Sequence, residues 1–169
     1  MSTPHHPTPA LEDQRMPVKA KLAATWASFM FLYIYVDYFQ LYKPGAIDDI
    51  LVGIVFEFQI SPTLLTVFTA SVAIPILMVM LSMTLPARVN RVANLVVALL
   101  YIPYSVFNAA GEAWAWAPFY ALSIGIEVLL LVFILHAAWT WPRTAPTAGP
   151  ADGADPAAVR IEQDHRTGG

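Results

Sequence analysis

The chain reads LLTVFTASVAIPILMVMLSMTL from Leu64 to Leu85, a stretch that contains no Asp, Glu, Lys or Arg. A helix needs about 20 mostly apolar residues to cross the hydrocarbon core of a bilayer. Backbone polar groups inside hydrocarbon must bond to one another, so a stretch of this kind is helical there. Residues 64–85 are therefore predicted to form one membrane-spanning helix.

Three further stretches have the same character and lie on both sides of the first. They run from about Leu22 to Leu41, Val92 to Ala110 and Pro118 to Trp141. Four spans in succession predict an all-α, integral membrane four-helix bundle with up-down-up-down topology. The membrane domain is expected over residues 20–141. Disordered tails are expected at residues 1–19 and 142–169, because both are rich in proline and polar residues.

Whole-chain composition agrees with a membrane protein, since 57% of the residues are hydrophobic and 12% are charged. A soluble domain carries about 25% charged residues. The net charge of -3 provides no basic surface for nucleic acid, and no such partner is expected. There is no cysteine, which excludes disulfides and cysteine-ligated metal sites. No catalytic, metal-binding or cofactor-binding motif is found, so the sequence predicts neither an enzyme nor a cofactor.

The cationic residues predict the orientation in the membrane. Eight of them lie before the first span, between the second and third, or after the fourth: Arg15, Lys19, Lys21, Arg88, Arg91, Arg143, Arg160 and Arg166. Only Lys43 lies in the other set of loops. Because Lys and Arg concentrate in cytoplasmic loops, both termini are expected in the cytoplasm of a cell (plasma) membrane. Arg88 and Arg91 are also weak candidates for binding lipid headgroups.

The loop between the first two spans is too apolar for a plain connector. Apolar residues recur at helical spacing, namely Ile47, Ile50, Leu51, Ile54 and Phe58. Asp49, Gly53 and Glu57 occupy the opposite face, which predicts a short amphipathic helix lying along the outer surface. A strand over Phe56 to Ile60 is the alternative. The segment is expected to act as a connector or as a lid over a site between the helices.

Polar residues inside the spans are the candidates for function, because such groups are costly in hydrocarbon. Ten of them form stripes on three helices: Tyr33, Asp37, Gln40, Asn94, Tyr101, Tyr104, Asn108, Tyr120, Ser123 and Glu127. With a rise of about 1.5 Å per residue, most of the stripe residues fall in the outer half and Glu127 falls near the midplane. This predicts one outward-facing pocket that ends at Glu127. The alternative is that these residues only join the helices by hydrogen bonds.

Several short motifs resemble an uncharacterised bacterial family of four-span membrane proteins. In the first half they are Lys21-Leu22, Trp26, Tyr35-x-Asp37, Gly53 and Gln59-Ile60. The central signature comprises Ile74-Pro75-Ile76 and Asn90-Arg91-Val92-Ala93-Asn94, and Glu127 matches a Glu in the family's last span. The resemblance covers about Lys19 to Trp141 and implies a domain of unknown function. The family's layout is similar to that of the DoxX-like four-helix membrane proteins, some of which are linked to quinone or redox chemistry.

We therefore expect a multi-pass membrane protein that binds a lipid-like or small amphipathic molecule in the polar pocket. One alternative is a quinone-linked membrane redox accessory, and another is a structural or partner-binding membrane subunit. The expected partners are the lipid bilayer and the small amphipathic ligand, and the sequence is compatible with a homo-oligomer.

Overall fold

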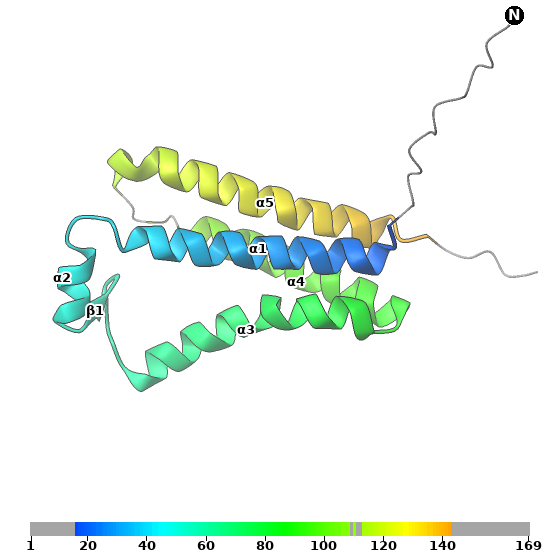
Figure 1. Cartoon of the computed structure of the whole chain (residues 1–169), viewed down its shortest axis with the longest axis horizontal. Coiled ribbons are helices and arrows are strands. Elements are labelled where there is room, and N and C mark those ends of the chain that lie inside the picture. The colour runs from blue at the N-terminus through cyan, green and yellow to red at the C-terminus, as the bar shows by residue number, and fades with distance from the viewer. Residues whose placement is uncertain (1–15, 109, 111–112, 143–169) are drawn as a thin grey trace, which may run out of the picture.

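The computed structural model describes residues 16–108, 110 and 113–142 (Figure 1). Its four long helices are α1 (Val18–Gln40), α3 (Pro62–Thr84), α4 (Ala87–Phe107) and α5 (Ala117–Trp139), and each is long and apolar enough to cross a membrane. The predicted all-α four-helix bundle is confirmed. Both α1 and α4 begin about one turn earlier than predicted. The expected disordered tails lie outside the described residues except at residues 16–19 and 142, and residues 18–19 are helical.

Proline and serine set the ends of the helices. At the start of α3 the Ser61 side chain accepts a hydrogen bond from the Leu64 backbone N–H at 3.1 Å, and Pro62 occupies the first turn, where no N–H donor is needed. Pro86 separates α3 from α4, because it cannot donate the backbone bond that would continue α3. A short 3-10 turn, η1 (Trp114–Trp116), leads into α5.

The two central helices, α1 and α5, pack against each other. On the outside, α3 packs mainly against α1 and α4 packs mainly against α5, while α3 and α4 touch little. We call the end that carries α2, β1 and β2 the hairpin end, and the end where α1 starts and α5 finishes the terminal end (Figure 1). The buried core lies toward the terminal end. It consists of Leu22, Trp26, Phe29, Met30, Met78, Ala98, Tyr101, Leu131, Ile134 and Ala138.

The helix α3 divides at Pro75, which lies inside it and is buried. No residue between Pro62 and Ile74 is buried, and this half of α3 runs away from α1 toward the hairpin end in Figure 1. Proline removes one backbone hydrogen bond and commonly bends a helix. The terminal half of the bundle is therefore tightly packed, whereas its hairpin half is open along α3.

The short helix predicted between α1 and α3 is confirmed, but it ends at Leu51 and does not continue to Phe58. This helix is α2 (Ala46–Leu51), and a hairpin of β1 (Ile54–Val55) and β2 (Phe58–Gln59) follows it. The strand alternative was therefore right for the second part. Gly53 adopts φ 83°, a left-handed conformation that ends helices, and its carbonyl accepts the Ile60 N–H at 2.8 Å.

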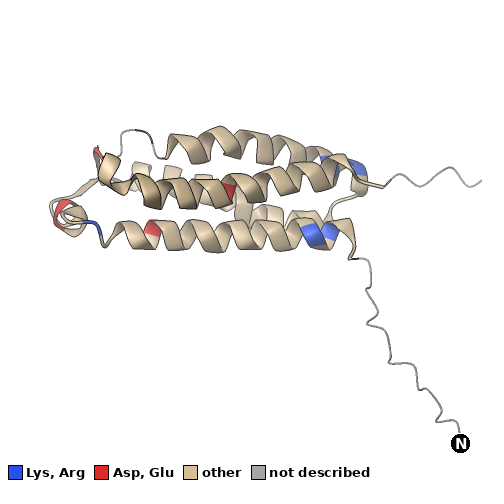
Figure 2. Ribbon diagram, turned by 90° about the horizontal axis from the view of Figure 1, so that it is seen from above, with Lys and Arg blue, Asp and Glu red and all other residues tan. Residues whose placement is uncertain are grey.

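Charge is distributed unequally between the two ends, as Figure 2 shows. At the terminal end the described basic residues are Lys19, Lys21, Arg88 and Arg91. At the hairpin end, Lys43 stands beside the acidic residues Asp48, Asp49 and Glu57. Four of the eight cations that predicted the orientation are among the described residues, and these four lie together at one end of the folded bundle.

Candidate functional site

Six polar residues from three helices come together in the hairpin half of the bundle, and we call them the polar cluster. They are Tyr33, Asp37, Tyr104, Ser105, Asn108 and Glu127. The Tyr33 hydroxyl donates a hydrogen bond to the Tyr104 hydroxyl at 3.2 Å and accepts one from Asn108 Nδ2 at 3.2 Å. These bonds join α1 to α4. Five of the six residues are among the ten predicted ones, and Ser105 is the addition.

Glu127 is a buried member of the cluster, with only 3% of its surface exposed. Ser105, which is fully buried, faces its carboxyl from α4. Among the described residues, neither Glu127 Oε2 nor Ser105 Oγ has a hydrogen-bond partner. Buried polar atoms are nearly always paired, and an unpaired one costs about 1–3 kcal/mol. Ser105 is close enough to act on the Glu127 carboxyl through a side-chain hydrogen bond, yet neither oxygen has a partner of normal geometry, so this position is a candidate for contact with a ligand.

Asp37 is the second carboxyl of the cluster. It lies close enough for its charge to act on both Tyr33 and Glu127. No lysine or arginine in the described part of the chain forms an ion pair with Asp37 or Glu127. Ionisable residues within membrane helices are usually paired. The described residues also contain no group of three or more potential ligands that could hold a metal ion.

The cluster is closed on one side and open on the other. Tyr33 and Tyr104 still meet α3 around Pro75. Asp37 and Asn108 lie about one turn further toward the hairpin end and are exposed. The cluster therefore reaches the surface of the bundle at Asp37 and Asn108.

The remaining predicted residues of α1 and α5 lie between the cluster and the hairpin end. Tyr120 is buried, and its hydroxyl accepts a hydrogen bond from Lys43 Nζ at 2.9 Å. Ser123 donates its hydroxyl hydrogen to the Phe119 carbonyl at 2.8 Å, within its own helix. Gln40 is the last residue of α1 and is half-buried. Tyr120, Ser123 and Glu127 thus form a buried stripe down α5.

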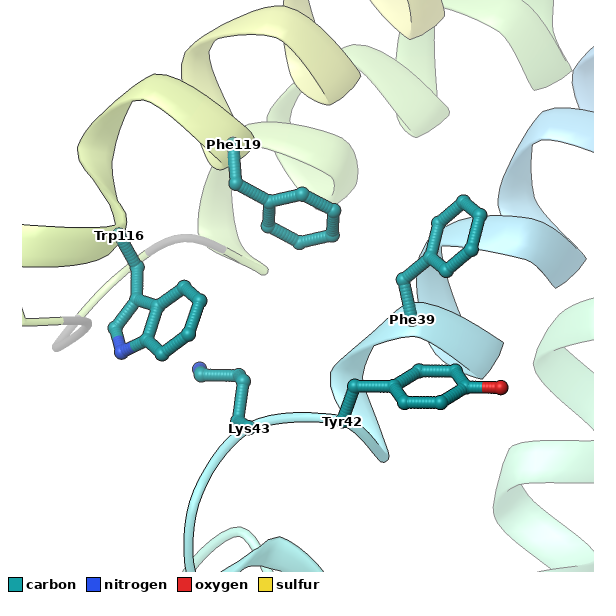
Figure 3. A pocket seen from close by; sticks show the side chains of 5 residues that line it. All are labelled: Phe39, Tyr42, Lys43, Trp116 and Phe119. Carbon is teal, nitrogen blue, oxygen red and sulfur yellow. The ribbon is translucent and has the colours of Figure 1, made fainter.

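A cleft of about 410 Å³ lies at the hairpin end, and we call it the aromatic cleft (Figure 3). Its lining residues are Phe39, Tyr42, Lys43, Trp116 and Phe119. The Lys43 ammonium lies 5.6 Å from the centroid of the Trp116 ring and 5.0 Å from that of Tyr120. None of the five lining residues was predicted as a ligand residue, and the only signal in the sequence was that Lys43 is the lone cation of its loop.

Asn94 does not belong to the polar cluster, which corrects the prediction of a single ten-residue pocket. It lies toward the terminal end. Its Oδ1 accepts hydrogen bonds from Trp26 Nε1 at 2.7 Å and from Ser82 Oγ at 3.3 Å. Its Nδ2 donates a hydrogen bond to Asn90 Oδ1 at 2.7 Å. Asn90 Nδ2 donates to the Ser82 carbonyl at 2.6 Å. That carbonyl is four residues before Pro86, which cannot supply its usual helical donor. We call these residues (Trp26, Ser82, Asn90 and Asn94) the asparagine network.

Tyr101 also has a structural partner outside the cluster. Its hydroxyl donates a hydrogen bond to the Ser71 carbonyl of α3. Ser71 precedes Pro75 by four residues, so its carbonyl has no backbone N–H to bond within the helix. Tyr101 therefore replaces the bond that the proline removes. The three residues of the heptad-spaced line therefore belong to different sets of contacts. Asn94 is in the asparagine network, Tyr101 bonds to the Ser71 carbonyl, and Asn108 is in the polar cluster.

The predicted lipid-contacting arginines differ from each other. Arg91 Nε donates to the Ala138 carbonyl at 3.1 Å near the end of α5, whereas Arg88 is exposed. Lys19 Nζ similarly donates to the Leu85 carbonyl at 2.7 Å, just beyond α3. Cations at helix C-termini interact favourably with the last carbonyls. Two of the residues that predicted the orientation thus also fasten helices together.

A comparison with known protein families matches residues 12–147 to a family of unknown function (DUF6326). The chain belongs to this family, which confirms the resemblance to an uncharacterised family, while the similarity of layout to DoxX-like proteins stays a prediction. Searches of curated proteins and of solved structures find no match. The function must therefore be inferred from the site itself.

Proposed function

We propose that this protein is a multi-pass protein of the cell membrane that binds a small amphipathic, lipid-like molecule in the hairpin half of its bundle. The observation that carries the proposal is the buried Glu127 carboxyl, whose Oε2 has no partner beside the equally unpaired Ser105 hydroxyl. A ligand that donates a hydrogen bond to these oxygens would satisfy both. Binding sites typically combine apolar walls with a few placed polar groups, and the polar cluster has that character.

The apolar part of such a ligand has a place along α3. The first half of α3 has no buried residue, and its exposed side chains include Leu65 and Val67. A molecule whose polar head reaches the cluster could lie with its apolar part against this helix and the surrounding lipid. Asp37 and Asn108 are exposed, and the head would reach the cluster from the bilayer at these residues.

We also propose that both termini face the cytoplasm and that the hairpin end faces outward. The four basic residues at the terminal end support this orientation, because Lys and Arg are enriched in cytoplasmic loops. The polar cluster then lies in the outer half of the membrane. The hairpin, with exposed Ile54, Phe56 and Phe58, would rest on the outer headgroups.

The proposed activity is binding rather than catalysis. The cluster offers carboxyl, hydroxyl and amide groups that hold a ligand, and no pair of them forms a nucleophile with its base. A quinone-linked redox accessory and a purely structural subunit remain as alternatives. In the same experiment the redox accessory predicts a bound quinone, and the structural subunit predicts no bound molecule.

The test is native mass spectrometry of the protein released from mild detergent, followed by identification of any bound molecule. Wild-type protein is expected to carry one amphipathic molecule in stoichiometric amount. Glu127→Gln should lose most of it, because the amide replaces one acceptor oxygen by a donor. Glu57→Gln is the matched control, since Glu57 is an exposed carboxyl in the hairpin turn and should leave binding unchanged.

The outcomes separate the alternatives. An isoprenoid quinone in the released fraction would replace the proposal with the redox accessory. A clean apo mass for wild type in two different detergents, with a loss of stability alone in Glu127→Gln, would support the structural subunit and overturn ligand binding.

A further inference from the structure

We propose that the ligand head recognised by the polar cluster is a protonated amine, so that the protein binds a hydrophobic organic cation. This inference rests on the proposed function and deepens it by assigning the chemical class of the ligand. It is built on the two carboxyls of the cluster, the unpaired acceptor oxygens and the aromatic rings around them.

The cluster contains two carboxyls and no described cationic side chain. Asp37 and Glu127 are within electrostatic reach of each other, and no described lysine or arginine forms an ion pair with either. In a low-dielectric environment two nearby carboxyls repel strongly if both are charged. A cation placed between them would be attracted to both, whereas a carboxylate or phosphate would be repelled.

The unpaired atoms are acceptors that a nitrogen donor would satisfy. Glu127 Oε2 accepts when the carboxyl is ionised, and Ser105 Oγ offers lone pairs beside it. An ammonium group carries several N–H donors and no acceptor, so it matches this pair of oxygens. A neutral alcohol has one donor and could satisfy only one of the two at a time. Hydrogen bonds to charged groups are also about twice as strong as neutral ones.

Two members of the cluster, Tyr33 and Tyr104, are themselves aromatic and pack against further rings, which adds to the preference for a cation. The rings of Phe29 and Tyr33 stack with centroids 5.9 Å apart, and those of Tyr101 and Tyr104 meet edge to face at 5.4 Å. The face of an aromatic ring attracts an ammonium within about 6 Å. The same preference is visible in the separate aromatic cleft, where the chain's own Lys43 lies against aromatic rings (Figure 3).

The surroundings of the site are acidic as well. Besides the two cluster carboxyls, the described acidic residues at the hairpin end are Asp48, Asp49 and Glu57, against the single cation Lys43. A surface with this balance raises the local concentration of cations and lowers that of anions. A cationic amphiphile in the outer leaflet would therefore meet a favourable field before it reaches Glu127.

The experiment compares three probes with the same apolar chain: dodecylamine, dodecanol and dodecanoate. Each is titrated into the full-length protein in phosphatidylcholine nanodiscs, and binding to empty nanodiscs is subtracted. Wild-type protein is expected to bind the amine at least about tenfold more tightly than dodecanoate, the difference that one charge-assisted hydrogen bond supplies. Glu127→Gln should abolish this preference. Gln59→Ala, at an exposed and uncharged position of the hairpin, is the control and should retain it.

Asp37→Asn provides a second variant that does not disturb buried packing, because Asp37 is exposed. It should lower amine affinity about threefold to tenfold and leave dodecanol binding unchanged. If wild type binds all three probes equally and Glu127→Gln weakens them all, the amine assignment is wrong while the binding pocket stands. If no probe binds and native mass spectra are clean, both the amine assignment and the proposed function are wrong.

Discussion

Removing the Tyr101 hydroxyl should destabilise the protein only as long as Pro75 is present. In the structure this hydroxyl donates to the Ser71 carbonyl, which lacks a helical donor because Pro75 stands four residues later. Tyr101→Phe leaves that carbonyl unpaired in a membrane interior. Pro75→Ala restores a backbone N–H at the position that normally bonds to Ser71, so the hydroxyl is no longer needed.

The expected magnitude follows from the partners that are lost. Interhelical hydrogen bonds in membrane proteins average about 0.6 kcal/mol and reach about 1.7 kcal/mol. The Ser71 carbonyl has no alternative backbone donor, which places this bond in the upper part of the range. We expect Tyr101→Phe to lower the free energy of unfolding by about 1–2 kcal/mol in the wild-type background. With Pro75→Ala present, the same change should cost no more than about 0.5 kcal/mol.

The assay is reversible unfolding in mixed micelles, in which the fraction of SDS is raised while far-UV circular dichroism is recorded. All four members of the double-mutant cycle are measured under one condition. Tyr35→Phe serves as the control, because Tyr35 is exposed on α1 and its hydroxyl should contribute nothing in either background. A cost for Tyr101→Phe that is equal with and without Pro75 would refute the idea that Tyr101 replaces the bond removed by the proline.

Two further predictions concern the terminal half of the bundle. Asn94→Ala should lower the free energy of unfolding by about 1–3 kcal/mol in the same assay, because it leaves the buried Trp26 Nε1–H unpaired. If the substitution does not change the fluorescence of Trp26, the asparagine network is contradicted. Arg91→Gln should cost about 0.5–1 kcal/mol, since it removes the bond to the Ala138 carbonyl and the stacking of the guanidinium on Trp139 at 5.7 Å. Arg91→Lys keeps the charge and should recover only part of that loss, and full recovery would show that charge alone matters.

The fold could be predicted from the sequence because the relevant signals are local. A run of about 20 apolar residues must be helical in a membrane whatever lies beside it. Four such runs therefore determine four helices, and short loops determine that neighbours alternate in direction. The segment after α1 was harder, because Ile54 and Phe58 satisfy a helical repeat as well as a strand pattern. Gly53, in a left-handed conformation, ends the helix before them.

The site could be predicted only in part, because helical spacing gives the face of a residue but not its partner. Asn94, Tyr101 and Asn108 share one face of α4, yet fourteen residues of helix extend about 21 Å along the membrane normal. One pocket in the outer half cannot contain all three. The partners of each residue on α4 depend on how α1 and α3 are placed against that helix. This placement comes from the packing of Trp26, Phe29 and other core residues. The aromatic cleft depends on the same placement.

A buried polar residue in a membrane helix can hold helices together or bind a ligand, and the number of its hydrogen bonds distinguishes the two roles. The amide of Asn94 is used on both sides, with two bonds accepted by Oδ1 and two donated by Nδ2. Glu127, at similar burial, has an oxygen without any partner among the described residues. The asparagine network, together with Arg91 and Lys19, fastens the terminal half of the bundle. Because that half holds the helices together, the hairpin half can carry two carboxyls that no described lysine or arginine neutralises, and the proposed ligand would compensate for the cost of burying them.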